Sequence, residues 1–109
     1  NREILAANGK DDSMMEYEQS FLMGERRFTS DRGLGVHLNY YLTKKTGRTA
    51  YDDLYGIRIE KKVQGEQEET EQTPALSASR QMVEQLAGKL IDGAVTPVCM
   101  MEIIDDLTG

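Results

Sequence analysis

Between Val36 and Thr43, apolar and polar side chains alternate at every position. One set of alternate positions holds Val36, Leu38, Tyr40 and Leu42, and the other holds His37, Asn39, Tyr41 and Thr43. A period of two is typical of an antiparallel strand with one face on a core and the other in water. We therefore expect a sheet that is buried on one side only.

Three further segments have the composition of strands that accompany this one. Residues 21–29 precede it, and the sequence Ser30-Asp31-Arg32-Gly33 between them favours a hairpin turn. Gly24 interrupts the alternation in the first segment, which predicts a β-bulge that exchanges the two faces of the strand. Residues 54–63 follow, with apolar side chains at alternate positions. Residues 67–73 contain no apolar side chain, so a strand there is expected at the charged edge of the sheet.

The pattern changes to a helical period after Pro74. Ser77 or Ser79 is placed to cap a helix that extends to about Asp92, and Gly93 is expected to end it in a left-handed conformation. The predicted buried stripe of this helix consists of Met82, Val83, Leu86, Leu90 and Ile91.

A second helix is expected to begin at Thr96-Pro97, which supply an N-cap and a first-turn proline, and to end near Leu107. Its predicted buried stripe consists of Met100, Ile103, Ile104 and Leu107. Strands followed by helices predict an α+β fold: an antiparallel three- to four-stranded meander with two C-terminal helices packed on one face. Residues 1–20 are interpreted as a flexible N-terminal arm, and residues 21–109 as a single domain.

Charge and composition exclude several classes of protein. The chain has 13 Lys and Arg against 19 Asp and Glu, a net charge of −6, and most of the acidic excess follows Val63. This balance disfavours nucleic acid as a partner. No apolar run approaches the ~20 residues of a membrane span. The single cysteine, Cys99, has no partner for a disulfide within the chain, and the single histidine, His37, excludes a zinc site of several histidines.

Three sequence motifs resemble a known family. They are Tyr40-Tyr41-Leu42, Tyr55-Gly56-Ile57-Arg58-Ile59-Glu60-Lys61-Lys62, and Thr96-Pro97-Val98 followed by Glu102-Ile103-Ile104-Asp105-Asp106. Their order and spacing resemble a family of short uncharacterised proteins of clostridial bacteria, over about residues 38–107. The resemblance implies a bacterial, cytoplasmic protein of unknown function, and it transfers no catalytic residue.

Two groups of residues are candidates for binding. The outer side of the predicted sheet presents His37, Asn39, Tyr41 and Arg58, together with Glu60 and Lys62. Aromatic and arginine side chains are enriched at protein interfaces, so this side is a candidate docking surface. The sequence Lys44-Lys45-Thr46-Gly47-Arg48 is a basic cluster on an expected loop, where Lys44, Lys45 and Arg48 would bind a phosphate or an acidic partner surface. A solvated hairpin tip is the simpler interpretation of this cluster.

The acidic end of the second helix provides an alternative site. Glu102, Asp105 and Asp106 stand at positions i, i+3 and i+4, so their carboxylates would share one face and offer the oxygen ligands that Mg²⁺ and Ca²⁺ prefer. A solvated helix face is the simpler interpretation of these three residues. His37 and Cys99 are the remaining candidates for catalysis, but neither has a recognisable motif around it.

These observations favour a small cytoplasmic, non-enzymatic protein that binds another protein or a second copy of itself. No cofactor is expected. The alternative is a module that binds a small molecule or a divalent metal through the acidic helix face. An enzyme centred on His37 or Cys99 is the third hypothesis.

Overall fold

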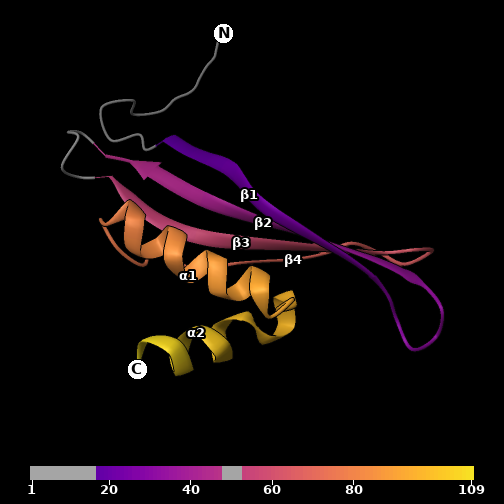
Figure 1. The fold of residues 1–109 in the computed structure, drawn as a ribbon. Coiled ribbons are helices and arrows are strands. Elements are labelled where there is room, and N and C mark those ends of the chain that lie inside the picture. The colour runs from indigo at the N-terminus through magenta and orange to yellow at the C-terminus, as the bar shows by residue number, and fades with distance from the viewer. Residues whose placement is uncertain (1–16, 48–52) are drawn as a thin grey trace, which may run out of the picture.

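The computed structural model describes residues 17–47 and 53–109. The elements are β1 (Tyr17–Thr29), β2 (Gly35–Thr46), β3 (Leu54–Val63), β4 (Glu69–Gln72), α1 (Arg80–Asp92), the short 3-10 helix η3 (Pro97–Cys99) and α2 (Met100–Thr108). Figure 1 shows a twisted sheet with both α-helices on one of its faces. The predicted α+β architecture is confirmed.

The four strands form one antiparallel sheet in the order β1-β2-β3-β4, so each strand pairs with the one before it in the chain. The hairpin between β1 and β2 closes as predicted. Ser30 accepts a backbone hydrogen bond from Gly33, and Gly33 adopts a φ of 80°, a conformation that glycine tolerates best. Figure 1 shows this hairpin extending beyond the helices.

The predicted bulge lies in β1. The pairing of β1 with β2 shifts between Leu22, which lies opposite Tyr41, and Gly24, which lies opposite Tyr40. An extra residue in one strand of an antiparallel pair has this effect, and it places Gly24, Arg26 and Phe28 on the same side of the sheet as Phe21. β1 begins at Tyr17, so residues 17–20, assigned above to the N-terminal arm, belong to the sheet. Residues 1–16 lie outside the described residues.

The core lies between the sheet and the helices. Its buried members are Val36, Leu38, Tyr40, Leu42, Tyr55, Ile57, Ile59, Val83, Leu86, Ala87, Leu90, Met100 and Ile104. The period-two positions of β2 and β3 thus face the helices as expected. Tyr40 is fully buried, and its hydroxyl donates a hydrogen bond of 2.8 Å to the carbonyl of Val95. Burial raises the pKa of Tyr40 to about 12, which keeps this donor protonated.

Two residues predicted in the buried stripes remain exposed. Met82 is 45% exposed and Leu107 is 43% exposed. They line an open groove of about 440 Å³, together with Gln85, Leu86, Lys89 and Thr108. The two helices therefore leave their facing ends in contact with solvent, and the stripe that is buried on each helix is narrower than its apolar pattern indicated.

The end of α1 also differs from the prediction. Ser79 caps the helix by accepting a hydrogen bond from the backbone of Met82, but Gly93 has a φ of −87°, and the left-handed residue is Ala94 with a φ of 49°. The Ala94 N–H bonds to Ile91 and the Val95 N–H bonds to Leu90, which is the Schellman pattern displaced by one residue. The predicted second helix is divided into η3 and α2, and Thr96 makes no side-chain cap.

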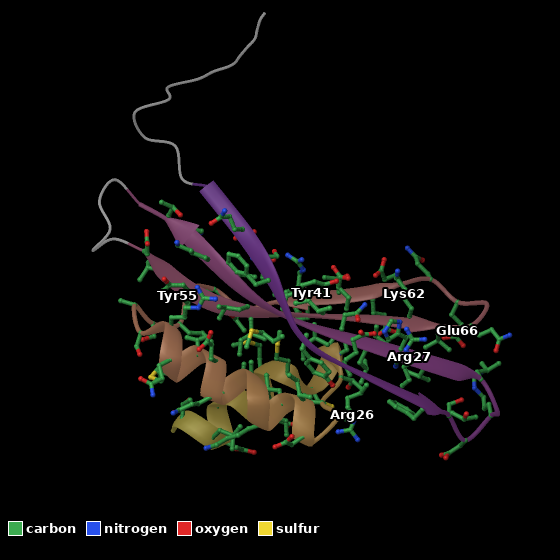
Figure 2. All side chains as sticks on the ribbon, turned by 45° about the horizontal axis from the view of Figure 1, so that its top comes forward. Arg26, Arg27, Tyr41, Tyr55, Lys62 and Glu66 are labelled. Atoms are coloured by element: carbon green, nitrogen blue, oxygen red, sulfur yellow. The ribbon has the colours of Figure 1, made fainter. Side chains whose placement is uncertain are left out.

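Strand β1 holds the carboxyl end of α1 in place. The Arg26 guanidinium donates a hydrogen bond of 2.9 Å to the carbonyl of Ile91, and lies 3.4 Å from the carbonyl of Asp92. A cation is favourable at the carboxyl end of a helix. Gly24 lies beneath the same turn, because a Cβ atom there would lie 2.8 Å from the Cδ1 of Ile91. Figure 2 shows Arg26 on the helix side of the sheet.

Candidate functional site

The side of the sheet turned away from the helices is called the outer face below. Because alternate residues share a face, the strand pairing assigns to it Ser20, Leu22, Glu25, Arg27, His37, Asn39, Tyr41, Arg58, Glu60 and Lys62. Within the described residues, no helix covers this face (Figure 1). Tyr41 and Lys62 project from it on the side opposite Arg26 (Figure 2). The outer face therefore combines several of the candidate residues on one accessible surface.

Arg58 is the centre of one cluster on the outer face. Its guanidinium carbon lies 4.6 Å from the centre of the Tyr41 ring, directly across the pairing of β2 with β3. It also donates a hydrogen bond of 2.8 Å to the Ser20 hydroxyl of β1, and its Nε lies 3.3 Å from a carboxylate oxygen of Glu60. These contacts join β1, β2 and β3 and hold the Arg58 side chain in one position.

The hydroxyl of Tyr41 belongs to the same cluster. Desolvation raises the pKa of Tyr41 above its usual value, and the neighbouring Glu60 carboxylate raises it further. The phenol therefore stays protonated at neutral pH and acts as a hydrogen-bond donor. Together with the ring that stacks on Arg58, this gives the outer face an aromatic platform with a polar tip, a combination that suits a protein interface.

His37 is the centre of a second cluster. Its Nε2 lies 2.6 Å from Oε1 of Glu25, and the Arg27 guanidinium lies 3.5 Å from the same oxygen. The hydrogen bond with His37, assisted by Arg27, lowers the pKa of Glu25, against the smaller effect of desolvation. Arg27 and Lys62 are the two cross-strand neighbours of His37, so a row of basic side chains crosses three strands.

At the other end of the outer face, near Gly56, side chains from β1 and β4 contact each other. Gln72 of β4 donates a hydrogen bond of 3.0 Å to Glu18 of β1, across the two strands that separate them. A Cβ atom on Gly56 would lie 2.7 Å from the Thr73 hydroxyl, which leaves no room for a side chain. Thr43 is buried here, although the period-two pattern placed it on the wet side. A cavity of about 40 Å³ remains, far below the ~300–1,000 Å³ of ligand pockets.

The structure brings together only some of the candidate residues. His37, Asn39, Tyr41 and Arg58 share the outer face. The basic cluster predicted on a loop is instead largely strand, because β2 extends to Thr46, and Lys44 and Lys45 therefore point to opposite sides of the sheet. Lys44 lies 3.6 Å from the Asp53 carboxylate. Arg48 lies outside the described residues.

Four residues of the outer face were missed by the prediction from sequence, and all four lie on β1: Ser20, Leu22, Glu25 and Arg27. Ser20 was assigned to the N-terminal arm, and Leu22 and Glu25 lie on either side of the bulge, where the alternation of faces changes. The signal that locates them is Gly24, because a bulge at this glycine places Leu22 and Glu25 on one face despite their odd separation.

The acidic residues of α2 lie elsewhere. Glu102, Asp105 and Asp106 are exposed on the helix side of the molecule. In the part of the chain that the structure describes, no three His, Cys, Asp or Glu side chains are grouped closely enough to hold a metal ion. Cys99 is a free, exposed thiol in η3. A metal site on the α2 acids remains a prediction from sequence.

Comparison with known protein families shows to which family this chain belongs. It matches the family described as a family of unknown function (DUF6514) over residues 19–109. The chain belongs to the DUF6514 family. The match begins before the region of the three sequence motifs and includes β1 from Gln19 onward, so every residue assigned to the outer face falls within the DUF6514 range.

Two further comparisons gave no relatives from which to transfer an activity. A search of curated proteins found no match to this DUF6514 chain, and neither did a search of solved structures. Across residues 17–47 and 53–109, no helix has the length and apolarity to cross a membrane. The case for a function therefore rests on the chemistry of the site.

Proposed function

We propose that this DUF6514 chain is a non-enzymatic protein-interaction module and that the outer face is its binding surface. The observation that carries the proposal is the position of Leu22, which is 54% exposed beside the stacked pair of Tyr41 and Arg58. Tyrosine and arginine are enriched at the energetic centres of protein interfaces, and the exposed Leu22 beside them provides apolar surface that a partner would cover.

The contacts that hold several side chains of the outer face in fixed conformations support the same proposal. Arg58 is held by Tyr41, Ser20 and Glu60, and His37 is held by Glu25. Side chains that are already fixed lose less conformational entropy when a partner covers them. Binding of a partner to these three neighbouring strands would therefore cost less entropy than binding to mobile side chains.

The charges of the outer face define the chemistry of the partner. Arg27 and Lys62 flank His37, and the Arg27 side chain is 73% exposed. A partner surface that presents carboxylates to these two residues, and an apolar side chain to Leu22 and Tyr41, is complementary to the outer face. A protein partner with an acidic rim around an apolar contact is therefore the kind that we propose.

The His37–Glu25 pair serves recognition in this proposal, rather than catalysis. A carboxylate that orients a histidine is also part of catalytic sites, where a nucleophile contacts the other ring nitrogen. Among the described residues, no serine, threonine or cysteine side chain forms a hydrogen bond with His37, and the pair lies on an open sheet face. These features support a binding role.

The cellular setting is also a proposal. The resemblance of the three sequence motifs to proteins of clostridial bacteria supports a bacterial cytoplasm as the place where the partner is met. Fractionation of cells that express the chain from its own gene tests this setting, because recovery in the membrane or the medium would contradict it.

A site-specific cross-linker tests the proposed surface. In one variant a photoreactive amino acid replaces Lys62, which is exposed at the outer face on β3. In a second variant of the same chain it replaces Val98, which is 81% exposed in η3. We expect irradiation of cells to give a discrete product with another protein at position 62 only. Mass spectrometry of the product identifies the partner, and its surface must carry the acidic and apolar groups described above.

Two outcomes would contradict the proposal. One is the absence of any discrete product at position 62, and the other is the same set of products at both positions, which would indicate random collisions. A product of twice the mass of one chain would identify a second copy as the partner of the outer face.

A further inference from the structure

The two edges of the sheet are protected to different degrees. β4 ends one side with four residues, Glu69–Gln72, two of which are acidic. β1 ends the other side with thirteen residues, and among the described strands it pairs only with β2. An edge strand presents unpaired backbone N–H and C=O groups that can pair with another chain. The short length and the charge of β4 disfavour pairing with another chain, whereas β1 offers a long edge for it.

The hydrogen bonds of the sheet show which groups of β1 point outward. The carbonyl of Gly35 accepts a bond from the backbone of Gln64, so the backbone groups of Gly35 face β3. Thr29 lies opposite Gly35, and its N–H and C=O therefore face away from β2. Alternation assigns the same orientation to Arg27 and Glu25.

The other side of the bulge follows in the same way. The backbone N–H of Thr73 bonds to the carbonyl of Ile57, so Ile57 faces β4, and its partner Leu42 must bond to Phe21 on β1. The outward groups in this half of β1 then belong to the residues on either side of Phe21 and to Glu18. The complete outward set is Glu18, Ser20, Leu22, Glu25, Arg27 and Thr29.

We propose that this free edge pairs with β1 of a second copy of the chain, antiparallel, about a two-fold axis between Leu22 and Met23. In this register Glu18 lies opposite Arg27 of the second copy, and Ser20 lies opposite its Glu25. All four of these residues point their backbone groups outward, so each pair exchanges backbone hydrogen bonds, and the two-fold axis repeats each pair.

Charge selects this register from its neighbours. A shift by two residues in one direction places Glu18 opposite Glu25, which sets like charges against each other. A shift in the other direction places Glu18 opposite Thr29 and leaves Leu22 opposite Glu25. Opposite charges at facing positions stabilise a strand pair, and like charges destabilise it. Only the proposed register of these three pairs Glu18 with Arg27.

The side chains concerned are accessible for the contact. The Arg27 side chain is 73% exposed and that of Glu25 is 43% exposed. Glu18 is exposed, and it exchanges its hydrogen bond with Gln72 for the arginine of the second copy when the dimer forms. The exposed Leu22 side chains of the two copies meet on the outer face beside the axis.

The resulting dimer has one continuous sheet with four strands from each copy. A two-fold axis perpendicular to the sheet keeps all the helices on one side and joins the two outer faces on the other. This inference goes beyond the proposed function and does not depend on it, because the pairing is made by the backbone edge of β1. The two proposals share Leu22 and Arg27, but the cross-linker at Lys62 lies on β3, two strands away from that edge.

A charge exchange tests the pairing. We expect sedimentation equilibrium of the purified chain to give twice the mass of one chain. Arg27→Glu sets two glutamates opposite each other at both symmetric positions, and we expect it to raise the dissociation constant by roughly tenfold or more. The double variant Glu18→Arg with Arg27→Glu restores the opposite charges and the dimer. Arg32→Glu makes the same change of charge in the β1–β2 turn and leaves the dimer intact.

A cysteine cross-link tests the register independently of charge. With Cys99→Ser as the background, Leu22→Cys places two thiols beside the axis, and mild oxidation is expected to join the copies. Thr29→Cys lies on the same face and edge but far from the axis, and it is expected to stay unlinked. Circular dichroism and thermal unfolding show that each variant is folded.

The outcomes separate this inference from the proposed function. A single-chain mass at every concentration would overturn the dimer, and so would a dimer that Arg27→Glu leaves unchanged or one that Thr29→Cys links more readily than Leu22→Cys. A monomer that still gives a cross-linked partner at position 62 would overturn the edge pairing alone. A dimer without such a partner would overturn the proposed function alone.

Discussion

Glu25 is the carboxylate of the outer face whose pKa links the stability of the fold to pH. The hydrogen bond with His37, with help from Arg27, lowers its pKa from the ordinary value of 4.5. The folded state therefore binds a proton at this carboxylate less readily than the unfolded state does. The stabilisation from Glu25 is complete above pH 4.5 and is lost as the pH falls through the lower pKa of the folded state.

We expect Glu25→Gln to lower the melting temperature at neutral pH, because the amide cannot form the charged hydrogen bond with His37. The difference from the wild type should narrow as the pH falls below 4.5 toward the lower pKa of the folded state, where the wild-type carboxylate becomes neutral, as the amide is. Thermal unfolding followed by circular dichroism across this range measures it. A difference that stays constant with pH would show that the carboxylate does not stabilise the folded state.

Prediction from sequence reached the right residues on β2 and β3 but missed their partners on β1. The alternation from Val36 to Thr43 is regular, so it placed His37, Asn39 and Tyr41 on one face correctly. Glu25 lies beyond the bulge, where the number of residues that separate two positions no longer tells whether they share a face. The alternation of neighbouring side chains cannot show how the bulge shifts the pairing of β1 with β2.

At the scale of elements, the end of β4 passes close to β3 because Gly56 has no side chain. A Cβ atom at this position would lie 2.7 Å from the Thr73 hydroxyl, 3.0 Å from the Thr43 hydroxyl and 3.1 Å from the carbonyl of Pro74. The first two atoms are buried, and the Thr73 hydroxyl also accepts a hydrogen bond from the backbone of Ile57. The segment after β4 therefore has little freedom to move away.

We expect Gly56→Ala to lower the free energy of unfolding by about 1–3 kcal/mol, because the added methyl group forces Thr73 and Pro74 away from β3. Gly35→Ala is the matched control in a neighbouring strand, where the nearest atom to the added Cβ, an oxygen of Gln64, lies 3.9 Å away. Urea unfolding of the two variants measures the difference. Equal free energies of unfolding for the two variants would contradict the close approach of Thr73 and Pro74 to β3.

The elements themselves were largely predictable, and their ends were less so. Residues 54–63 were predicted as a strand, and β3 has these bounds. Gly93 was predicted to be left-handed because glycine adopts that conformation at least cost, but the turn continues by one residue and places Ala94 there. The choice depends on the hydrogen bonds of Val95 and Ala94 with α1, which are tertiary details that residue preference does not contain.

At the scale of the whole molecule, the two helices and the sheet share one core. Met100 at the start of α2 is fully buried, whereas the adjacent Met101 is 37% exposed. We expect Met100→Ala to lower the free energy of unfolding by about 2–5 kcal/mol, since a cavity would form in that core. Met101→Ala should change it by less than about 0.5 kcal/mol.

Urea unfolding of the two methionine variants provides the measurement, and a single cooperative transition is expected for both. A small and equal effect of the two substitutions would show that α2 does not contribute to the core.

The architecture of the molecule followed from the order of periodicities in the chain, because a period of two followed by a helical period leaves few arrangements. The exposure of Met82 and Leu107 did not follow, since it depends on how the two helices diverge. Hydrophobic periodicity indicates which side of a helix is apolar, but the breadth of its burial is decided by the neighbouring element.

The meander order has a consequence for how the chain acquires its structure. Because each strand pairs with its predecessor, the sheet closes only short loops of chain, and the entropy lost in closing them is small. The bonds from Tyr40 to Val95 and from Arg26 to Ile91 close much longer loops, across separations of 55 and 65 residues. We expect refolding to begin in the hairpins, with the helical layer joining last and the Arg26 bond among the final contacts to form.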